Sequence, residues 1–599
     1  MACENCDPIL AQATNFSMNA TQANSRERLR QVIDAEIKSL EESIRALRIH
    51  RNALAPISSL PPEVLAAIFS LLCSSPGIPL DGKPDQNITQ IYVSHVCHQW
   101  REIILNQPLL WSHVDFTTLS SAGVSAVLLR SKSLPLYLEG MMSSRRWDDV
   151  RLSTFQEELQ AHLPRIYHLR IYAKPHHLRR TLEGLVLPAP TLEYLSLYSR
   201  CGYENRVDLL IPDTLFDGSA PGLSHLVLRN CNISWNSPFI KGLKHLEIVR
   251  PSINARPELS VWLGALDQMP QLETLTLYSA SPVAPPFPFD VERTITLPSL
   301  THIDISGSSE DCALAIAHLN IPAITSLCLT VIYDLSNCEE IQKLLPYVVE
   351  HINRTQDRPL QSALIRGDRN HLNIAVWPVP DIDVEVHDTP ALLGVALPPC
   401  VSLAFRTGPE DWSGIGSDAH REILDWVIAG LPLNNLVTLA AQDIADISPL
   451  ALNLQVEEFW LLHSQQWPLL QRVRLAIPVD SGFIRMLLED NGGSENPLLP
   501  SLTELVLVND RLDSYLAPPL CDALMKRVEQ RVPLELLDLR MCYHDLDNTA
   551  PVQLLSEIVV DVLVPEEDTE AREQMRSMWD PLTPFIGDEN FGEESQSDR

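Results

Sequence analysis

The sequence predicts an α/β protein in which an N-terminal helix and a small all-α unit precede an irregular α/β solenoid. Apolar residues recur at spacings of three and four near the N-terminus, two short amphipathic helical patterns follow, and a proline-led aliphatic pattern then recurs along the remaining chain. These patterns divide the chain into five expected segments: a disordered N-terminus (1–24), a helix (25–55), an all-α unit (57–115), a repeat region (125–564) and a disordered acidic tail (565–599).

The charge of the chain limits the classes of partner that it can bind. Its 77 acidic and 45 basic residues give a formal net charge of -32, which repels nucleic-acid phosphates and anionic lipid headgroups. No apolar stretch of about 18 residues is present to span a bilayer, and the N-terminus lacks the basic and apolar regions of a signal peptide. We therefore expect no nucleic-acid partner, no membrane association, and a soluble protein in the cytoplasm, the nucleus or both.

The cysteines predict neither a disulfide framework nor a metal site. Twelve of them are scattered from Cys3 to Cys542, which fits reduced and mostly buried thiols when no signal peptide is present. Cys3 and Cys6 have the spacing of half a zinc site, but a tetrahedral site needs four ligands and no second pair follows. We expect no metal and no cofactor.

The segment 25–55 is expected to be one amphipathic helix with an apolar seam of the coiled-coil type. Acidic residues precede basic ones by four positions at Asp34 to Lys38 and Glu41 to Arg45, which is the favourable order on an exposed helix. The helix must end by Pro56. We expect the seam either to associate with a second copy of the chain or to fold back on its own domain; it consists of Ile33, Ile37, Leu40, Ile44 and Leu47.

Two further helical patterns lie between residues 57 and 111. The run LPPEVLAAIF, beginning at Leu60, has prolines that pre-set the first helical turn and a broad apolar stripe after it. A loop rich in proline, glycine and aspartate (74–86) leads to the run VSHVCHQWREII, beginning at Val93, and the run PLLW from Pro108 closes the unit.

This order of residues resembles the F-box, with a longer loop between the helices, as in the F-box-like variants expanded in fungi. In that family the motif binds a Skp-type adaptor, which bridges to the cullin scaffold of an SCF-type ubiquitin ligase. The resemblance implies an F-box-like domain at 57–115, with Phe69 and Trp100 as large apolar contributors. It places the adaptor contacts on Leu60, Pro61, Val64, Leu65, Ile68, Phe69, Val96, Trp100 and Trp111.

A simpler interpretation is that these apolar residues only form the core of a small helical domain, as such stripes usually do. His95, Cys97 and His98 resemble metal ligands in type, but they crowd within four residues of one helix, where only positions three or four apart share a face. We expect Cys97 to be a buried apolar contact.

Beyond residue 160 one pattern recurs eight times: proline, any residue, then aliphatic-x-x-aliphatic-x-aliphatic. Residues 223–233 and 502–512 extend it to the leucine-rich-repeat consensus, and 534–542 is a near match. The segment 125–564 therefore resembles leucine-rich repeats, in which the aliphatic residues face the core and the residues between them lie on an exposed parallel sheet. The copies begin at Pro164, Pro190, Pro221, Pro270, Pro298, Pro322, Pro468 and Pro500.

The spacing of the copies is irregular, and residues 330–465 fit the pattern least. Prolines there interrupt strand-like alternations such as 382–386, which leaves room for a separate insertion. An unrelated α/β domain with short strands after proline turns is the alternative for this half of the chain.

If the repeat register is right, the residues that alternate with the repeat leucines are exposed on the sheet and form the surface for a protein target. Coverage of the tyrosines by a neighbouring loop is the alternative. The expected target-binding residues are Tyr194, Ser196, Tyr198, His225, Arg229, Thr274, Thr276 and Tyr278.

No motif of a common enzyme class stands out. The pattern G-x-G-x-x-A at 414–419 lacks the strand that precedes it in dinucleotide-binding sites, so we expect a loop and a helix start there. The leading hypothesis is a non-enzymatic substrate-recognition adaptor of an SCF-type ubiquitin ligase. A protein-interaction scaffold that does not act in ubiquitination is the main alternative, and a hydrolase-like α/β enzyme in the C-terminal half is a third.

Overall fold

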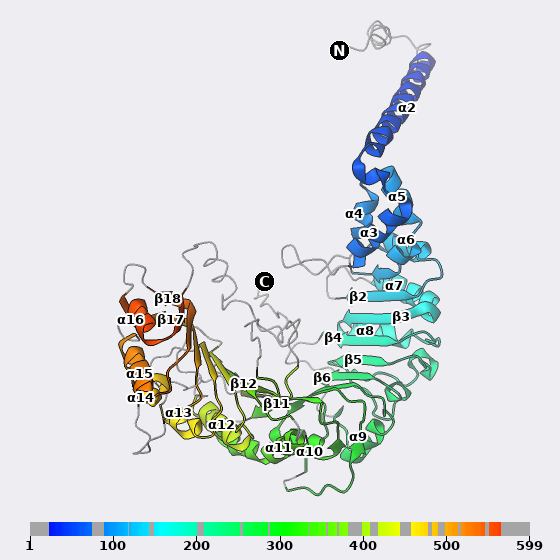
Figure 1. Ribbon diagram of the computed structural model, residues 1–599. Coiled ribbons are helices and arrows are strands. Elements are labelled where there is room, and N and C mark those ends of the chain that lie inside the picture. Colours follow the sequence, from blue (N-terminus) through cyan, green and yellow to red (C-terminus); the bar gives the residue numbers. More distant parts are fainter. Residues whose placement is uncertain are drawn as a thin grey trace, which may run out of the picture. The chain divides into compact units, whose positions relative to one another are not determined.

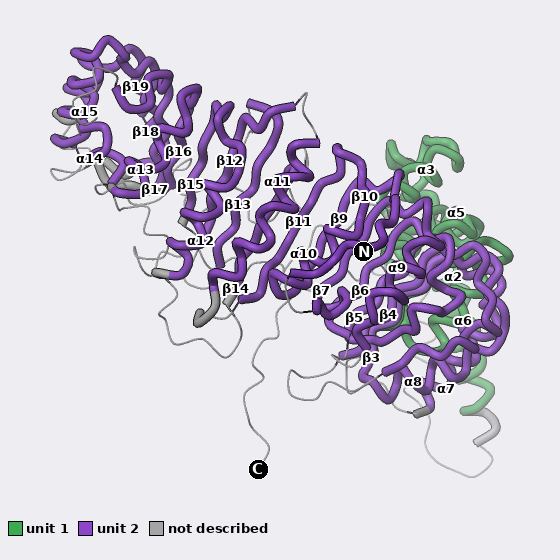
Figure 2. Tube along the Cα trace, turned by 90° about the horizontal axis from the view of Figure 1, so that it is seen from below, with its two compact units in different colours: residues 1–140 green, residues 141–599 purple. Residues whose placement is uncertain are grey.

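The computed structural model describes residues 23–74, 89–117, 119–142, 149–200, 209–251, 255–285, 288–333, 335–354, 358–367, 371–380, 398–407, 417–443, 457–476, 482–488, 497–512, 517–544 and 550–564. The expectations for the N-terminus before residue 23, the acidic tail, Cys3 and Cys6, the alternation at 382–386 and most of the glycine pattern at 414–419 lie outside these residues. The chain forms two compact units, residues 1–140 and 141–599 (Figure 2).

Unit 1 is mainly helical, as the sequence predicts. Its long first helix, α2, spans Ala23–Ala53 and ends three residues before Pro56, where a helix loses a donor and meets a steric clash. The remaining elements are η2 (Pro56–Ser59), α3 (Pro62–Ser74), α4 (Thr89–Ser94), α5 (His98–Leu105), η3 (Pro108–Trp111), β1 (His113–Asp115), α6 (Ser121–Arg130) and β2 (Leu136–Met142), with β1 and β2 paired in parallel.

Unit 2 contains a large sheet in which almost all neighbouring strands are parallel. Its strands are β3 (Ile166–Ala173), β4 (Tyr194–Ser199), β5 (His225–Arg229), β6 (His245–Val249), β7 (Thr274–Tyr278), β9 (His302–Gly307), β11 (Ser326–Tyr333), β12 (Ser362–Gly367), β13 (His371–Trp377), β14 (Val401–Thr407), β15 (Thr438–Asp443), β16 (Arg472–Ala476), β17 (Glu504–Leu512), β18 (Leu536–His544) and β19 (Asp561–Leu563). A separate parallel pair joins β8 (Ile295–Thr296) to β10 (Leu319–Asn320).

The helices of unit 2 lie along one face of this sheet (Figure 1). Seen from below, α10 and α11 lie in front of β9 and β11 (Figure 2). These helical elements are α7 (Asp149–His162), η4 (Leu163–Arg165), α8 (Pro175–Glu183), η5 (Leu215–Gly218), η6 (Pro238–Ile240), α9 (Leu259–Leu266), α10 (Ser309–Ala317), η8 (Leu335–Lys343), α11 (Leu345–Asn353), α12 (Ser417–Gly430), α13 (Glu457–Ser464), α14 (Gly482–Leu488), α15 (Ala517–Glu529) and α16 (Ala550–Ile558). We call the opposite side, on which none of the described helices lies, the helix-free face.

Strand order follows chain order except at one place. From β3 to β11 and from β15 to β19 each strand pairs in parallel with the next one in this sheet. Between these runs the spatial order is β11, β14, β13, β12, β15, and β13 runs antiparallel to both of its neighbours. The irregularity expected within residues 330–465 is therefore an antiparallel strand inside the same sheet.

Each of the eight proline-led copies runs into a strand. The strand begins four residues after the proline in seven copies and two residues after Pro164 in the first. The aliphatic residues of the pattern are buried between sheet and helices, as alternation in a strand requires. Ile324 is the exception, because it is 74% exposed and the neighbouring Thr325 is buried instead, donating its hydroxyl to the Leu300 carbonyl oxygen at 2.7 Å.

Candidate protein-interaction surfaces

Helix α3 is apolar on two sides, and only one of them is covered. Leu65 and Phe69 are fully buried in unit 1, whereas Val64 and Leu72 are 42% and 52% exposed and Ile68 is half-buried. At 100° per residue the mean direction of Leu65 and Phe69 lies about 80° around the helix from that of the other three, and Leu72 borders Leu65. The sequence predicted one broad apolar stripe on this helix. In the structure the stripe has two adjacent parts, a core side that is buried and an outward side that is accessible.

The core side of α3 packs against α4 and α5. The rings of Phe69 and Trp100 lie 4.9 Å apart between centroids and are tilted by 56°. Trp111 is also buried, donates its indole N–H to the Ile104 carbonyl oxygen at 2.9 Å, and carries the Arg130 guanidinium 4.6 Å from its ring centroid. The large residues Phe69 and Trp111 of this segment therefore form the interior of the unit.

This placement corrects three of the nine adaptor contacts implied by the resemblance. Leu65, Phe69 and Trp111 are buried inside unit 1, so their side chains cannot touch another protein while the unit is folded. The remaining six are at least partly accessible: Leu60, Ile68 and Trp100 are half-buried, and Pro61, Val64 and Val96 are exposed.

Sequence reasoning missed other exposed apolar side chains of unit 1. Leu71, Tyr92 and Leu109 are 71%, 64% and 63% exposed. Leu71 completes the outward side of α3, since it follows Val64 by seven positions and Ile68 by three. That spacing was a usable signal. Cys97, expected to be buried, is half-buried where the chain enters α5.

In unit 2 the predicted strand register is correct. Leu192, Leu195 and Leu197 are buried, while Tyr194 and Tyr198 are half-buried on the helix-free face. The other expected target-binding residues also lie on that face: Arg229 is exposed, and His225, Thr274, Thr276 and Tyr278 are half-buried. Ser196 differs, because it is buried between its larger neighbours.

A row of rings crosses the helix-free face at one register position. The Cα partners along it are His168, Tyr194, His225, His245, Thr274 and His302. The rings of His168 and Tyr194 stack at 3.9 Å with an interplanar angle of 5°, and those of His225 and His245 stack at 4.0 Å and 20°. We call these six residues the ring row.

Three histidines of the ring row, His225, His245 and His302, have pKa values below the usual value of the imidazole. Burial lowers the pKa of His225, and the nearby His245 lowers it further; burial is also the main cause of the lowered pKa of His245 and His302. His245 is additionally within 2.7 Å of the Thr274 hydroxyl through its Nδ1 atom. A lowered pKa favours the neutral form of these three imidazoles, and the neutral rings of His225 and His245 can stack without repulsion.

His168, His245 and His302 were not among the expected site residues. The proline requirement excluded β6, which has the aliphatic pattern from Leu243 but no proline before it. Aligning the repeat copies on their second aliphatic residue would have revealed the row, because each ring residue stands immediately before that position.

Beside the ring row, Tyr278 donates its hydroxyl to a carboxylate oxygen of Asp304 at 2.7 Å. Burial raises the pKa of Asp304 to about 6, although the hydrogen bond from Tyr278 and the charge of Arg406 oppose the rise. Burial and the Asp304 charge raise the pKa of Tyr278, so this phenol stays protonated. The pair forms a partly buried polar contact between β7 and β9 on this face.

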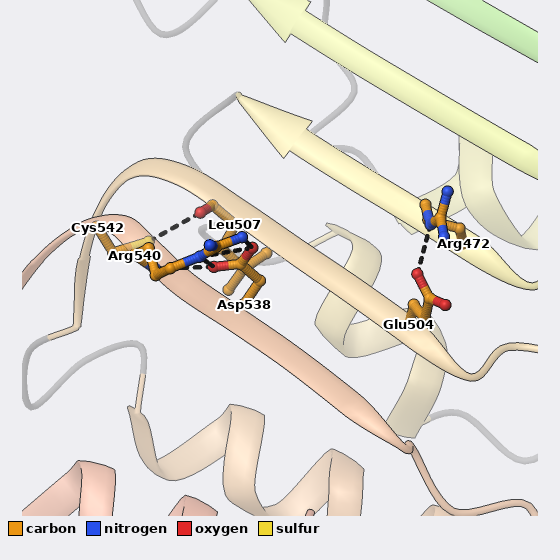
Figure 3. A network of polar contacts seen from close by, with 6 residues as sticks. All are labelled: Arg472, Glu504, Leu507, Asp538, Arg540 and Cys542. Carbon is orange, nitrogen blue, oxygen red and sulfur yellow. Dashed lines mark hydrogen bonds and ion pairs between the residues drawn. The ribbon is translucent and has the colours of Figure 1, made fainter. Parts of the chain in front are cut away.

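Charged residues of the same face form ion pairs with one another. Arg229 on β5 meets Glu247 on β6 at 2.8 Å. In the C-terminal strands, Arg472 pairs with Glu504, as Figure 3 shows. In the same view Arg540 donates hydrogen bonds to the Asp538 carboxylate from its Nε and Nη2 atoms, the latter at 2.7 Å (Figure 3). In each of these pairs a basic side chain is neutralised by an acidic one.

Within the described residues, no group of three or more His, Cys, Asp or Glu side chains is arranged to hold a metal ion. Among the helices of the described part, none is both long and apolar enough to cross a bilayer.

Comparison with known proteins identifies one segment. Residues 57–117 match the family model described as F-box-like. This match covers α3 to α5 and the closing turn, and it includes both the core side and the outward side of α3. No curated protein matches the chain.

Proposed function

We propose that this protein is a substrate-recognition adaptor of an SCF-type cullin-RING ubiquitin ligase. Its F-box-like segment binds a Skp-type adaptor and through it the cullin scaffold, and unit 2 binds a protein target. The chain carries out no chemistry itself, and it works in the cytoplasm, the nucleus or both. The observation that carries the proposal is the exposed apolar side of α3 within the segment that matches the F-box-like family.

The outward side of α3 has the chemistry of a docking surface. Glu63 is the only charged residue in its sequence, at the first turn, so nothing charged interrupts the apolar positions after it. Removing apolar surface from water is favourable by about 25 cal/mol per Å², and only the part of this gain that exceeds the entropic cost of association stabilises a complex. Val64, Ile68, Leu71 and Leu72 supply such a surface on a rigid helix, and Pro61 and Val96 extend it.

Co-purification of the full chain with a Skp-type adaptor and a cullin tests the adaptor site. Val64→Glu should abolish recovery of both, because it buries an unpaired charge in the interface. Leu129→Glu is the matched control, since Leu129 on α6 is 81% exposed and lies outside the matched segment; it should bind like the wild type.

The outcomes separate the candidate functions. Recovery of both partners by Val64→Glu would refute the site, and recovery of neither by the wild type would refute the adaptor function. Recovery of the adaptor without a cullin would instead favour an interaction scaffold that does not act in ubiquitination.

For unit 2 we propose a leucine-rich-repeat-like array that binds its target on the helix-free face. The half-buried Tyr194 and Tyr198 and the stacked rings of the ring row support this choice, because aromatic side chains are enriched at protein interfaces. Paired charges such as Arg229 and Glu247 would then form the polar surroundings of the contact.

The target site is tested by comparing the proteins that co-purify with the wild type and with a Tyr194→Ser, Tyr198→Ser double variant. The double variant should lose a set of proteins while keeping the Skp-type adaptor. Val186→Ser is the control, because Val186 is 59% exposed and precedes the strand instead of lying on the sheet. If the double variant and the control keep the same proteins as the wild type, the target does not bind at these tyrosines.

A further inference from the structure

The apolar seam of α2 is uncovered within unit 1. Ile37, Leu40, Ile44 and Leu47 are 49%, 52%, 48% and 69% exposed. All other described side chains from Arg26 to Arg51 are exposed as well, apart from the half-buried Leu29 and Ile33. A helix of 31 residues with a continuous apolar seam is stabilised in water mainly by packing that seam against something.

The spacing of the seam defines a heptad register. Ile37 and Ile44 occupy a positions, and Ile33, Leu40 and Leu47 occupy d positions. Arg30 and Arg51 are the next a positions at the two ends, and Leu54 is the next d position. The apolar part is therefore short and flanked by one arginine on each side.

We propose that α2 pairs with the α2 of a second copy of the chain as an antiparallel coiled coil. Antiparallel pairing places a positions opposite d positions. Aligning Ile37 with Leu47 of the partner subunit also aligns Leu40 with Ile44 of the partner subunit, which gives an uninterrupted apolar centre. Each terminal arginine then meets an aliphatic residue, along which its stem can lie while its charge reaches water.

Two kinds of contact beside the seam join complementary side chains in this arrangement, and a third joins like charges. In the antiparallel register the e position Asp34 faces Arg48 of the partner subunit, and the symmetry of the dimer makes this pair twice. The g position Glu36 likewise faces His50 of the partner subunit. One like-charged contact, between the two Glu41 side chains, lies at the centre.

A parallel dimer of the same helices is disfavoured by its charges. It would place Arg30 against Arg30 and Arg51 against Arg51 inside the seam, and Glu36 against Glu41 of the partner subunit beside it. Asp34 and Arg48 would face Leu29 and Ser43 of the partner subunit, so neither would gain an ion pair. Of the two ways in which α2 can pair with a second copy, the charges therefore favour the antiparallel one.

The mass of the full chain in solution tests the pairing. Sedimentation equilibrium should give twice the 67.1 kDa of one chain, and Ile37→Glu should return it to one chain. Val32→Glu is the matched control on the same helix, because Val32 is 60% exposed but lies off the seam; it should stay dimeric. A wild type that is monomeric at every concentration up to its solubility limit overturns the proposal, whether the seam folds back or stays bare.

Charge reversal tests the direction. Asp34→Arg and Arg48→Asp should each weaken the dimer by about tenfold, because each removes two ion pairs and creates two repulsions, and the double variant should restore it. Failure of the double variant to restore the dimer refutes the antiparallel register. Neither measurement depends on adaptor binding, so the result is independent of the proposed ligase function.

Discussion

Truncation of Phe69 separates a core role from a docking role in the F-box-like segment. The side chain is fully buried and its ring lies 4.9 Å from that of Trp100. Phe69→Ala removes the buried ring, leaves a cavity and breaks the aromatic pair, which together should lower the stability of the α3–α5 packing by about 4 kcal/mol. Phe69→Leu fills most of the cavity and should cost about 1.5 kcal/mol.

Hydrogen exchange of the full chain, followed by mass spectrometry of peptides from α3 and α5, measures this locally. A loss of about 4 kcal/mol should accelerate exchange in these helices by about 10³-fold while leaving peptides of unit 2 unchanged. Val64→Ala, at a 42% exposed position of the same helix, should change exchange by less than about tenfold. An intact fold with unchanged exchange in Phe69→Ala would show that Phe69 is not a core residue, and the division of α3 into two sides would fail.

Three further substitutions test unit 2 by equilibrium unfolding. Burial raises the pKa of Asp304 from 3.8 to about 6, so the contribution of its protonated form to stability is present below pH 4 and is lost as the pH rises through 6. Asp304→Asn should remove this decline, which amounts to about 3 kcal/mol. A variant whose stability depends on pH as that of the wild type does would contradict this assignment. Arg527 is buried and donates hydrogen bonds to the carbonyl oxygens of the loop before β17 at 3.0 to 3.1 Å. Arg527→Met should destabilise the unit by about 3 kcal/mol, because it leaves these carbonyl oxygens without their donor. A loss of stability below about 1 kcal/mol would show that water satisfies these carbonyls instead. Arg229→Ala breaks an ion pair that is 44% and 27% exposed and should cost less than about 1 kcal/mol, so a larger loss would indicate a packing role.

The sequence predicted unit 2 well wherever a proline marked the copy. Requiring proline kept chance matches low, and all eight marked copies run into strands. The same requirement hid β6 and β15, whose aliphatic residues from Leu243 and Leu436 follow the pattern without it. The direction of β13 could not be predicted, because alternation specifies which side chains face the core and is the same for parallel and antiparallel strands.

In the F-box-like segment the sequence indicated the helices but not which apolar residues are buried. Leu65 and Val64 are adjacent aliphatic residues of one helix, and nothing in their identity distinguishes the core side from the outward side. Which side of α3 is buried is decided by the position of Trp100 and of the other residues that pack on this helix. Their position depends on the fold of the whole unit. The resemblance to a family implied a docking surface on these residues, and three of the nine residues that it named are buried inside the unit.

The reversed strand β13 affects how the chain can be shortened. In a simple repeat array each repeat contacts only its neighbours, so the chain can gain or lose a repeat at many positions. Here β11 pairs with β14 across residues 326–407, and β12 pairs with β15 across residues 362–443, so the two spans interlock. Any cut between β11 and β15 breaks at least one of these ladders. Evolution by loss of repeats, and limited proteolysis that leaves folded fragments, should therefore both spare this stretch.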